Sequence, residues 1–289
     1  MKWFDYAAPQ SVSDALALAD KHPDARFLAG GTDLLVQLRS GRKATGFVVD
    51  VKRIAELNEI RFDETDGLTL GAAVPCYKIA AHRDIRRVYP SLVEVASLIG
   101  GTQIQGRASI GGNLCNAAPS ADAVPLLIVL GATCLMASAA GAREVPAEDF
   151  CTGPGTTVLR PGEILVSLRM PRPAARSGAA YLRFIPRNEM DIAVAGAAAS
   201  VAVENGVFRA ARIALASVAP TPLFVPEAGQ ALVDQPVSAE TMRRAAEIAK
   251  AAARPITDMR GTADYRRHLC AVLTRRAIEA AVERSLGDN

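Results

Sequence analysis

The sequence predicts an α+β fold in roughly three parts, and three observations lead to this expectation. The chain has 289 residues, a length that suits two or three domains. Half of the residues are apolar and 22% are charged, as in a globular protein with a substantial core. Strand-like and helix-like segments are mixed up to Met170. After the Pro- and Gly-containing stretch Pro171–Gly178, the pattern becomes three strands followed by two helices.

The first half begins with a helix expected over Ser11–Lys21, with Ser13 as its N-cap. A short strand over Ala25–Ala29 then runs into a Gly-Gly pair. Proline and glycine breaks divide the rest into short segments. We expect a helical or irregular stretch at 34–38, strands at 46–51, 68–71, 133–137 and 164–170, and helices from residue 77, over 91–98 and over 126–131.

The second half predicts a three-stranded sheet covered by helices. The strands are expected at Tyr181–Ile185, Ala193–Val203 and Phe208–Ser217, and the turn sequence Glu204–Gly206 predicts a hairpin between the last two. Two helices follow, expected at 239–253 and from 262 to about 286.

Charge and composition argue against several classes of protein. The formal charge is only +3 and no Lys/Arg block is present, which argues against nucleic-acid binding. No uncharged apolar run has the length of about 18 residues typical of a membrane-spanning helix. The five cysteines are scattered without a C-x-x-C pair and the three histidines are isolated. We therefore expect a cytoplasmic protein with no metal site in this chain.

Two Gly-Gly segments stand out, "FLAGGTDLL" (Phe27–Leu35) and "SIGGNLCNAAPSAD" (Ser109–Asp122). Glycine reaches positive φ and lets a backbone or a ligand approach closely. Successive N–H groups in such a turn can form a concave site for an anion such as a diphosphate. The hydroxyls of Thr32 and Ser109 could add hydrogen bonds. Neither the Rossmann nor the P-loop pattern is present. Two separate turns therefore suggest a dinucleotide held along a cleft between lobes.

Each of these signals is weak by itself. A lone Gly-Gly pair after a strand is usually an ordinary turn, and the second pair, followed by Asn113, also fits a helix start or a bulge. Asp122 also fits the N-cap of a following apolar helix.

Taken in order, the two segments resemble the two FAD-binding signatures of the molybdenum hydroxylase flavoproteins. These are the medium subunit of carbon monoxide dehydrogenase-type enzymes and the FAD domain of xanthine dehydrogenase. The resemblance covers nearly the whole chain. It extends to "VDVKRIAELNEI", "QIQGRASIGGN", "RPGEILVSLRMP", "RNEMDIAVAGAA" and "YRRHLCAVLTRRA", all in the family order.

The resemblance implies a two-lobed FAD-binding cradle of the vanillyl-alcohol-oxidase (PCMH) type with a C-terminal α+β domain. The first lobe is expected at residues 1–57, the second at 58–173 and the C-terminal domain at 174–289. The FAD diphosphate would be held by the turn comprising Ala29, Gly30, Gly31, Thr32, Asp33 and Leu34, and by the turn containing Ser109, Gly111, Gly112 and Asn113.

Other site residues are implied in the same way. Asp122 would accept hydrogen bonds from FAD hydroxyls. Cys115 and Asn116 would lie near the flavin ring or the ribityl chain, and Leu165 near the flavin or the adenine. The remaining positions are Thr102, in a loop that closes on the flavin in relatives, and Arg183, where relatives often have Lys. Gly106 also departs from the larger polar residue that relatives often carry.

The implied function is electron transfer within a larger enzyme. A large subunit would carry the molybdenum-pterin cofactor and a small subunit two 2Fe-2S clusters. This chain would pass electrons through FAD to an external acceptor, and relatives usually assemble as a dimer of heterotrimers. The cofactor performs the redox chemistry, so we expect no catalytic side chain here.

Two other hypotheses stay open at this stage. The first is a self-sufficient FAD-dependent oxidoreductase of the same fold. It would need an acid or a base over the flavin, for which Tyr77 and Glu189 are the residues to test. The second is a scaffold that has lost its cofactor, which the intact glycine segments argue against.

Overall fold

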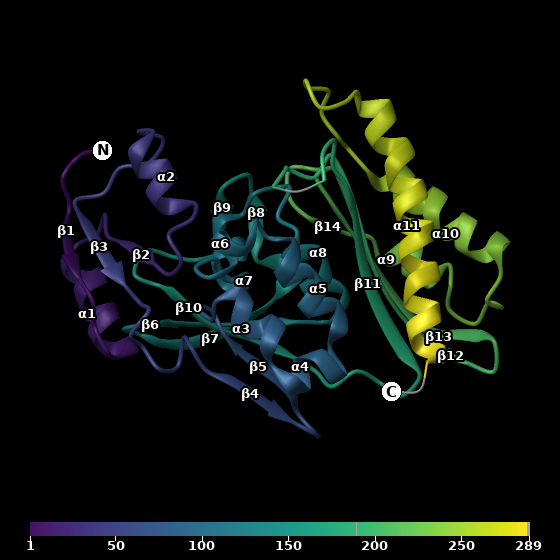
Figure 1. Cartoon of the computed structure of the whole chain (residues 1–289), viewed down its shortest axis with the longest axis horizontal. Helices are drawn as coiled ribbons and strands as arrows, with labels where there is room; N and C mark the ends of the chain where they lie inside the picture. The colour runs from purple at the N-terminus through teal and green to yellow at the C-terminus, as the bar shows by residue number, and fades with distance from the viewer. Residues whose placement is uncertain (189, 288–289) are drawn as a thin grey trace.

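The computed structural model describes residues 1–188 and 190–287, so Glu189 lies outside the described residues. Three larger sheets follow one another along the longest axis of the molecule (Figure 1). The N-terminal sheet lies at one end and the C-terminal sheet, with the long helix α11 (Ala263–Leu286), at the other.

The N-terminal sheet is parallel, with the strand order β1-β3-β2. Helix α1 packs Ala15 and Leu16 in a small core with Phe47 and Val49 of β3. The elements are β1 (Asp5–Ala7), α1 (Val12–Lys21), β2 (Arg26–Leu28), α2 (Leu34–Arg39) and β3 (Phe47–Asp50).

The expectation that Ser13 caps α1 is wrong. The N-cap is Ser11, which has an extended backbone and whose Oγ accepts a hydrogen bond of 3.1 Å from the Asp14 N–H. This N-cap to N3 bond satisfies one of the backbone donors at the start of the helix. Ser13 lies within the first turn of the helix.

The central part is built on a five-stranded antiparallel sheet in the order β4-β5-β10-β6-β7. Its strands are β4 (Ile60–Asp63), β5 (Gly67–Gly71), β6 (Thr133–Ser138), β7 (Gly141–Pro146) and β10 (Ile164–Met170). The helices are α3 (Cys76–Ala81), α4 (Arg83–Val88), α5 (Pro90–Leu98), α6 (Thr102–Gln105), α7 (Ile110–Asn116) and α8 (Ala123–Val129). A 3-10 turn (Ala147–Asp149) and the small pair β8 (Cys151–Gly153) and β9 (Thr156–Thr157) complete it.

The C-terminal sheet is antiparallel in the order β11-β12-β13-β14. The three expected strands form as β11 (Ser177–Phe184), β12 (Ala195–Glu204) and β13 (Val207–Ala216), and β14 (Leu223–Phe224) adds a fourth. The predicted hairpin is confirmed, and Asn205 and Gly206 have φ values of 52° and 73°. Two positive φ values match the twist that favours short hairpin turns.

Helices α9 (Pro226–Gln230), α10 (Ala239–Ala252) and α11 follow this sheet, and α11 lies along β11 and β12 (Figure 1). The opposite face of the sheet packs on the central part, because Ala198 of β12 and Ala214 of β13 belong to the core cluster that contains α8. The C-terminal sheet is therefore buried on both faces. No helix in the described ranges is long and apolar enough to cross a membrane.

Candidate functional site

The first glycine segment touches the residues that lead directly into the second one. A Cβ placed on Gly30 would overlap the carbonyl group of Arg107. Gly31 has a φ of +79°, a conformation that side chains rarely adopt. Both glycines are thus required by the backbone, and Gly30 is required because the backbone of Arg107 lies against it.

A side-chain hydrogen bond joins the same two regions. Gln37 of α2 donates from Nε2 to Oδ1 of Asn116 at the end of α7, at 2.8 Å. Helix α2, which follows the first glycine turn, and helix α7, which contains the second glycine pair, are therefore joined directly.

The second glycine segment is the start of a helix and not a free turn. Ser109 is the N-cap of α7, and its Oγ accepts from the N–H of Gly112 at 3.0 Å. A Cβ on Gly111 would overlap the backbone of Ala72, just after β5. The close approach at this glycine is therefore made by the protein's own backbone. Asn113 fixes the other side of α7, because its Oδ1 accepts from the N–H of Ala123 at 3.3 Å.

The first glycine turn presents unpaired backbone donors. Within the described ranges, the N–H groups of Gly30, Gly31, Thr32 and Asp33 donate to no protein acceptor. The next hydrogen bond in this turn runs from the N–H of Leu35 to the carbonyl of Gly31, at 3.1 Å. A run of such donors forms a concave site for an anion, which fits the diphosphate of a dinucleotide.

Asp122 lies at the contact between the central part and the C-terminal sheet. It occupies the N-cap position of α8, but its side chain makes no capping hydrogen bond to that helix. Its Oδ1 accepts from the Tyr181 hydroxyl at 2.8 Å, and its Oδ2 pairs with Arg183 at 2.5 Å. Burial raises the pKa of Asp122, while Arg183 and Tyr181 oppose that rise.

Arg183 and Tyr181 are themselves fixed by close packing. Arg183 also donates to the Leu98 carbonyl at 3.3 Å, so it binds two helices of the central part. Gly196, paired with Arg183 across β11 and β12, leaves room for the Tyr181 ring, because a Cβ there would overlap it. The Asp122–Tyr181–Arg183 network was not visible in the sequence, since its members are about 60 residues apart.

The remaining expected site residues lie in α7 and on other elements of the central part. Burial raises the pKa of the Cys115 thiol to about 12, so this thiol stays protonated at neutral pH. Leu165 is buried in β10, a strand that packs against α7. Thr102 is exposed at the start of α6. Tyr77, the candidate acid or base of the alternative hypothesis, is an exposed residue of α3.

A charged cluster at the carboxyl ends of β1 and β3 was missed by the sequence reading. The Tyr6 hydroxyl donates to Oδ2 of Asp50 at 2.5 Å, and Lys52 pairs with the same oxygen at 2.6 Å. Burial would raise the pKa of Asp50, but the hydrogen bonds from Lys52 and Tyr6 outweigh it and lower the pKa. Tyr6 and Asp50 are 44 positions apart, so no local sequence pattern indicates this contact.

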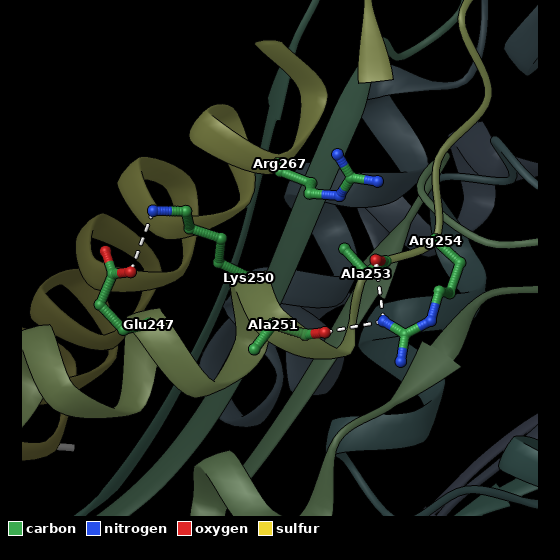
Figure 2. Close-up of a pocket in the computed structure, with 6 residues that line it drawn as sticks. All are labelled: Glu247, Lys250, Ala251, Ala253, Arg254 and Arg267. Carbon is green, nitrogen blue, oxygen red and sulfur yellow. Dashed lines mark hydrogen bonds and ion pairs between the residues drawn. The ribbon is translucent and has the colours of Figure 1, made fainter. Parts of the chain in front are cut away.

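Two hollows involve the C-terminal part of the chain, and the second also borders the end of the second glycine segment at Pro119 and Ser120. The first, of about 380 Å³ (Figure 2), has charges that are mostly paired, with Lys250 on Glu247 at 3.0 Å and Arg254 on the carbonyl of Ala251 at 2.7 Å. The second, of about 320 Å³, lies between Pro119 and the loop after β13, next to the buried Arg266. Among the described residues, no group of three His, Cys, Asp or Glu side chains could hold a metal ion.

Two protein families match consecutive parts of the chain. Residues 2–173 match the family "FAD binding domain in molybdopterin dehydrogenase", and residues 180–281 match the "CO dehydrogenase flavoprotein C-terminal domain". The chain is 34% identical to the xanthine dehydrogenase FAD-binding subunit of Escherichia coli O157:H7, over 96% of this chain and 97% of that subunit. It is 35% identical to the carbon monoxide dehydrogenase medium chain of Afipia carboxidovorans, over 98% of both chains.

A solved structure shows the same fold. A chain of carbon monoxide dehydrogenase from Hydrogenophaga pseudoflava superposes with a TM-score of 0.94 at 34% identity, covering 98% of both chains. The enzyme in that structure lacks the Mo-pyranopterin moiety of its molybdenum cofactor.

Proposed function

The chain belongs to the FAD-binding medium subunits of the molybdenum hydroxylase family, and from this membership we propose how its own residues hold the cofactor. It is an FAD-carrying electron-transfer subunit of a multi-subunit oxidoreductase. In this family the molybdenum-pterin cofactor and the 2Fe-2S clusters belong to a large and a small partner subunit. A self-sufficient flavoenzyme is not favoured.

The unpaired N–H groups of Gly30–Asp33 are the observation that carries the assignment of the diphosphate site. They are neutral donors on a rigid turn, and the turn is fixed by the contact of Gly30 with Arg107. The rest of the diphosphate wall is assigned to Ala29, Leu34 and the Ser109–Asn113 start of α7. When bound, FAD supplies the exchange between single electrons and electron pairs. The protein's task here is to bind and orient it.

The remaining contacts of the cofactor are proposed from their positions. Asn116 is held by Gln37 beside the first turn, which supports its assignment to the ribityl side together with Cys115. Asp122 has two protein partners, but each carboxylate oxygen has a second lone pair for an FAD hydroxyl. We assign Arg183 to holding Asp122 in place and leave Leu165 and Thr102 at the flavin end.

The assembly and its location are proposals of the same kind. We propose a dimer of heterotrimers, each made of this chain, the large subunit and the small subunit. We propose a cytoplasmic location, because the scattered cysteines form no disulfide in the described residues. The working domain limits are 1–57, 58–173 and 174–289.

The visible absorption spectrum of the purified chain and of its native complex tests the function. Cofactor released by heat is identified, and iron and molybdenum are measured in the complex. We expect about one FAD per chain, with iron and molybdenum in the complex only. FAD without any partner subunit would support the self-sufficient flavoenzyme instead. Absence of flavin from both samples would refute the cradle.

A further inference from the structure

Two arginines near the Tyr6–Asp50 hydrogen bond have no side-chain partner in the described part of the chain. Arg107 and Arg53 are exposed and take part in no ion pair and no side-chain hydrogen bond there. Arg107 leads into the second glycine segment, and its own carbonyl is the group that a Cβ on Gly30 would overlap. Arg53 follows Lys52, just after the end of β3.

The two arginines belong to one charged cluster. The Tyr6 hydroxyl is bound to Asp50, and the charges of both Arg53 and Arg107 act on that hydroxyl to lower its pKa against the effect of Asp50. Since Asp50 is already paired with Lys52, the cluster of Lys52, Arg53, Arg107 and Asp50 carries a net charge of +2.

The carboxylate of the turn does not cancel this charge. Burial raises the pKa of Asp33, and the nearby Arg42 and Lys43 oppose that rise. Two other cations therefore already offset Asp33, and the charge of the cluster stays available to a ligand.

A dinucleotide diphosphate carries two negative charges at neutral pH, whereas the backbone donors of Gly30–Asp33 carry no net charge. An arginine fork matches phosphate oxygens in geometry as well as in charge. We propose that Arg107, assisted by Arg53, neutralises the diphosphate held at the Gly30–Asp33 turn, and that this cluster makes the chain prefer a dinucleotide over an uncharged flavin. The proposal rests on the proposed function, since it needs the diphosphate at this turn.

The test measures the dissociation constants of FAD and of riboflavin, which lacks the diphosphate, on the FAD-free full chain. The variants are R107Q and R53Q, with R61Q as the matched control, because Arg61 is an exposed arginine of the separate sheet strand β4. We expect R107Q to weaken FAD binding about tenfold or more, R53Q to weaken it less, and R61Q to have no effect. Riboflavin binding should not change in any of them.

Salt gives an independent readout that needs no variant. The affinity of the unmodified chain for FAD should fall with rising salt more steeply than that of R107Q, because one screened ion pair is missing in the variant. An unchanged FAD affinity in R107Q, an equal loss of riboflavin affinity, or equal salt dependence of the two proteins would overturn the proposal.

The variant G30A separates this proposal from the one on which it rests. Its Cβ would push the first turn away from Arg107 without removing any charge. If G30A loses FAD while R107Q keeps it, the turn holds the diphosphate and only the charge assignment fails. If both keep FAD with unchanged affinity, the diphosphate does not lie at this turn.

Discussion

The Asp122–Arg183 ion pair gives the sharpest prediction about how the C-terminal domain is held. The side chains of Asp122 and Arg183 are only 11% and 8% exposed. Asp122→Ala leaves a guanidinium buried without its carboxylate, for which a loss of about 3–5 kcal/mol in the free energy of unfolding is typical. The carbonyl of Leu98 still accepts from Arg183, so we expect the lower end of that range.

The double variant removes the uncompensated charge. We expect Asp122→Ala combined with Arg183→Met to lose less stability than the sum of the two single variants, with a coupling of about 1–3 kcal/mol. Tyr181→Phe should cost about 1–3 kcal/mol, because it removes the hydroxyl that satisfies the other oxygen of Asp122.

Urea unfolding of the FAD-free chain, followed by circular dichroism, measures these free energies. The single tryptophan is no probe of this contact, because Trp3 is 98% exposed and precedes β1 of the N-terminal sheet. Additive single-variant losses, or an Asp122→Ala protein as stable as the parent, would refute the account of Asp122 as the residue that joins the two parts. Loss of FAD affinity in a variant of unchanged stability would instead make cofactor binding its main role.

Three further predictions concern other parts of the fold. Gly111→Val should abolish FAD retention, measured by the absorption spectrum, because the new side chain overlaps the Ala72 backbone. Gly106→Ala should retain FAD, since the atom nearest to its Cβ is at an ordinary contact distance of 3.7 Å. Equal FAD content in the two variants would contradict this. The Arg143 guanidinium lowers the pKa of Glu163 to about 2. The pair should therefore add about 3 kcal/mol to the free energy of unfolding above pH 4.5, and this is lost as the pH falls from 4.5 towards 2. A Glu163→Gln deficit in urea unfolding that persists at pH 2 would argue against that linkage. Ser217→Gly should raise the midpoint of thermal unfolding and add about 1 kcal/mol to the free energy of unfolding, because Ser217 has a φ of 65° and a buried hydroxyl with no partner among the described residues. A lower midpoint would show that the hydroxyl is used.

The sequence reading found the elements with strong local signals. Helices with an apolar stripe and caps, such as α10 and α11, and the hairpin at Asn205–Gly206 were found because their determinants lie within a few residues of one another. The strands β4, β7 and β14 were not expected, because β4 and β7 are partly exposed and β14 has two residues. Such strands form only when a neighbouring strand supplies the hydrogen bonds.

The candidate site divides in the same way. The glycine segments could be recognised because glycine at a fixed position is a local requirement of the backbone, although the sequence did not show that Gly30 and Gly111 are needed for contact with Arg107 and Ala72. The partners of Asp122 and the cluster around Asp50 were invisible, since each joins residues more than 40 positions apart.

By itself, then, the sequence determined the secondary structure of the well-patterned segments, the family resemblance and the two glycine segments that we propose to face a dinucleotide. The tertiary structure decided which charges remain available and which are already paired. The physical reason is that the free energy of an ion pair depends on the distance and burial of two side chains, and chain order fixes neither. Asp122 is therefore already paired by Arg183, whereas the exposed Arg107 side chain has no partner among the described residues.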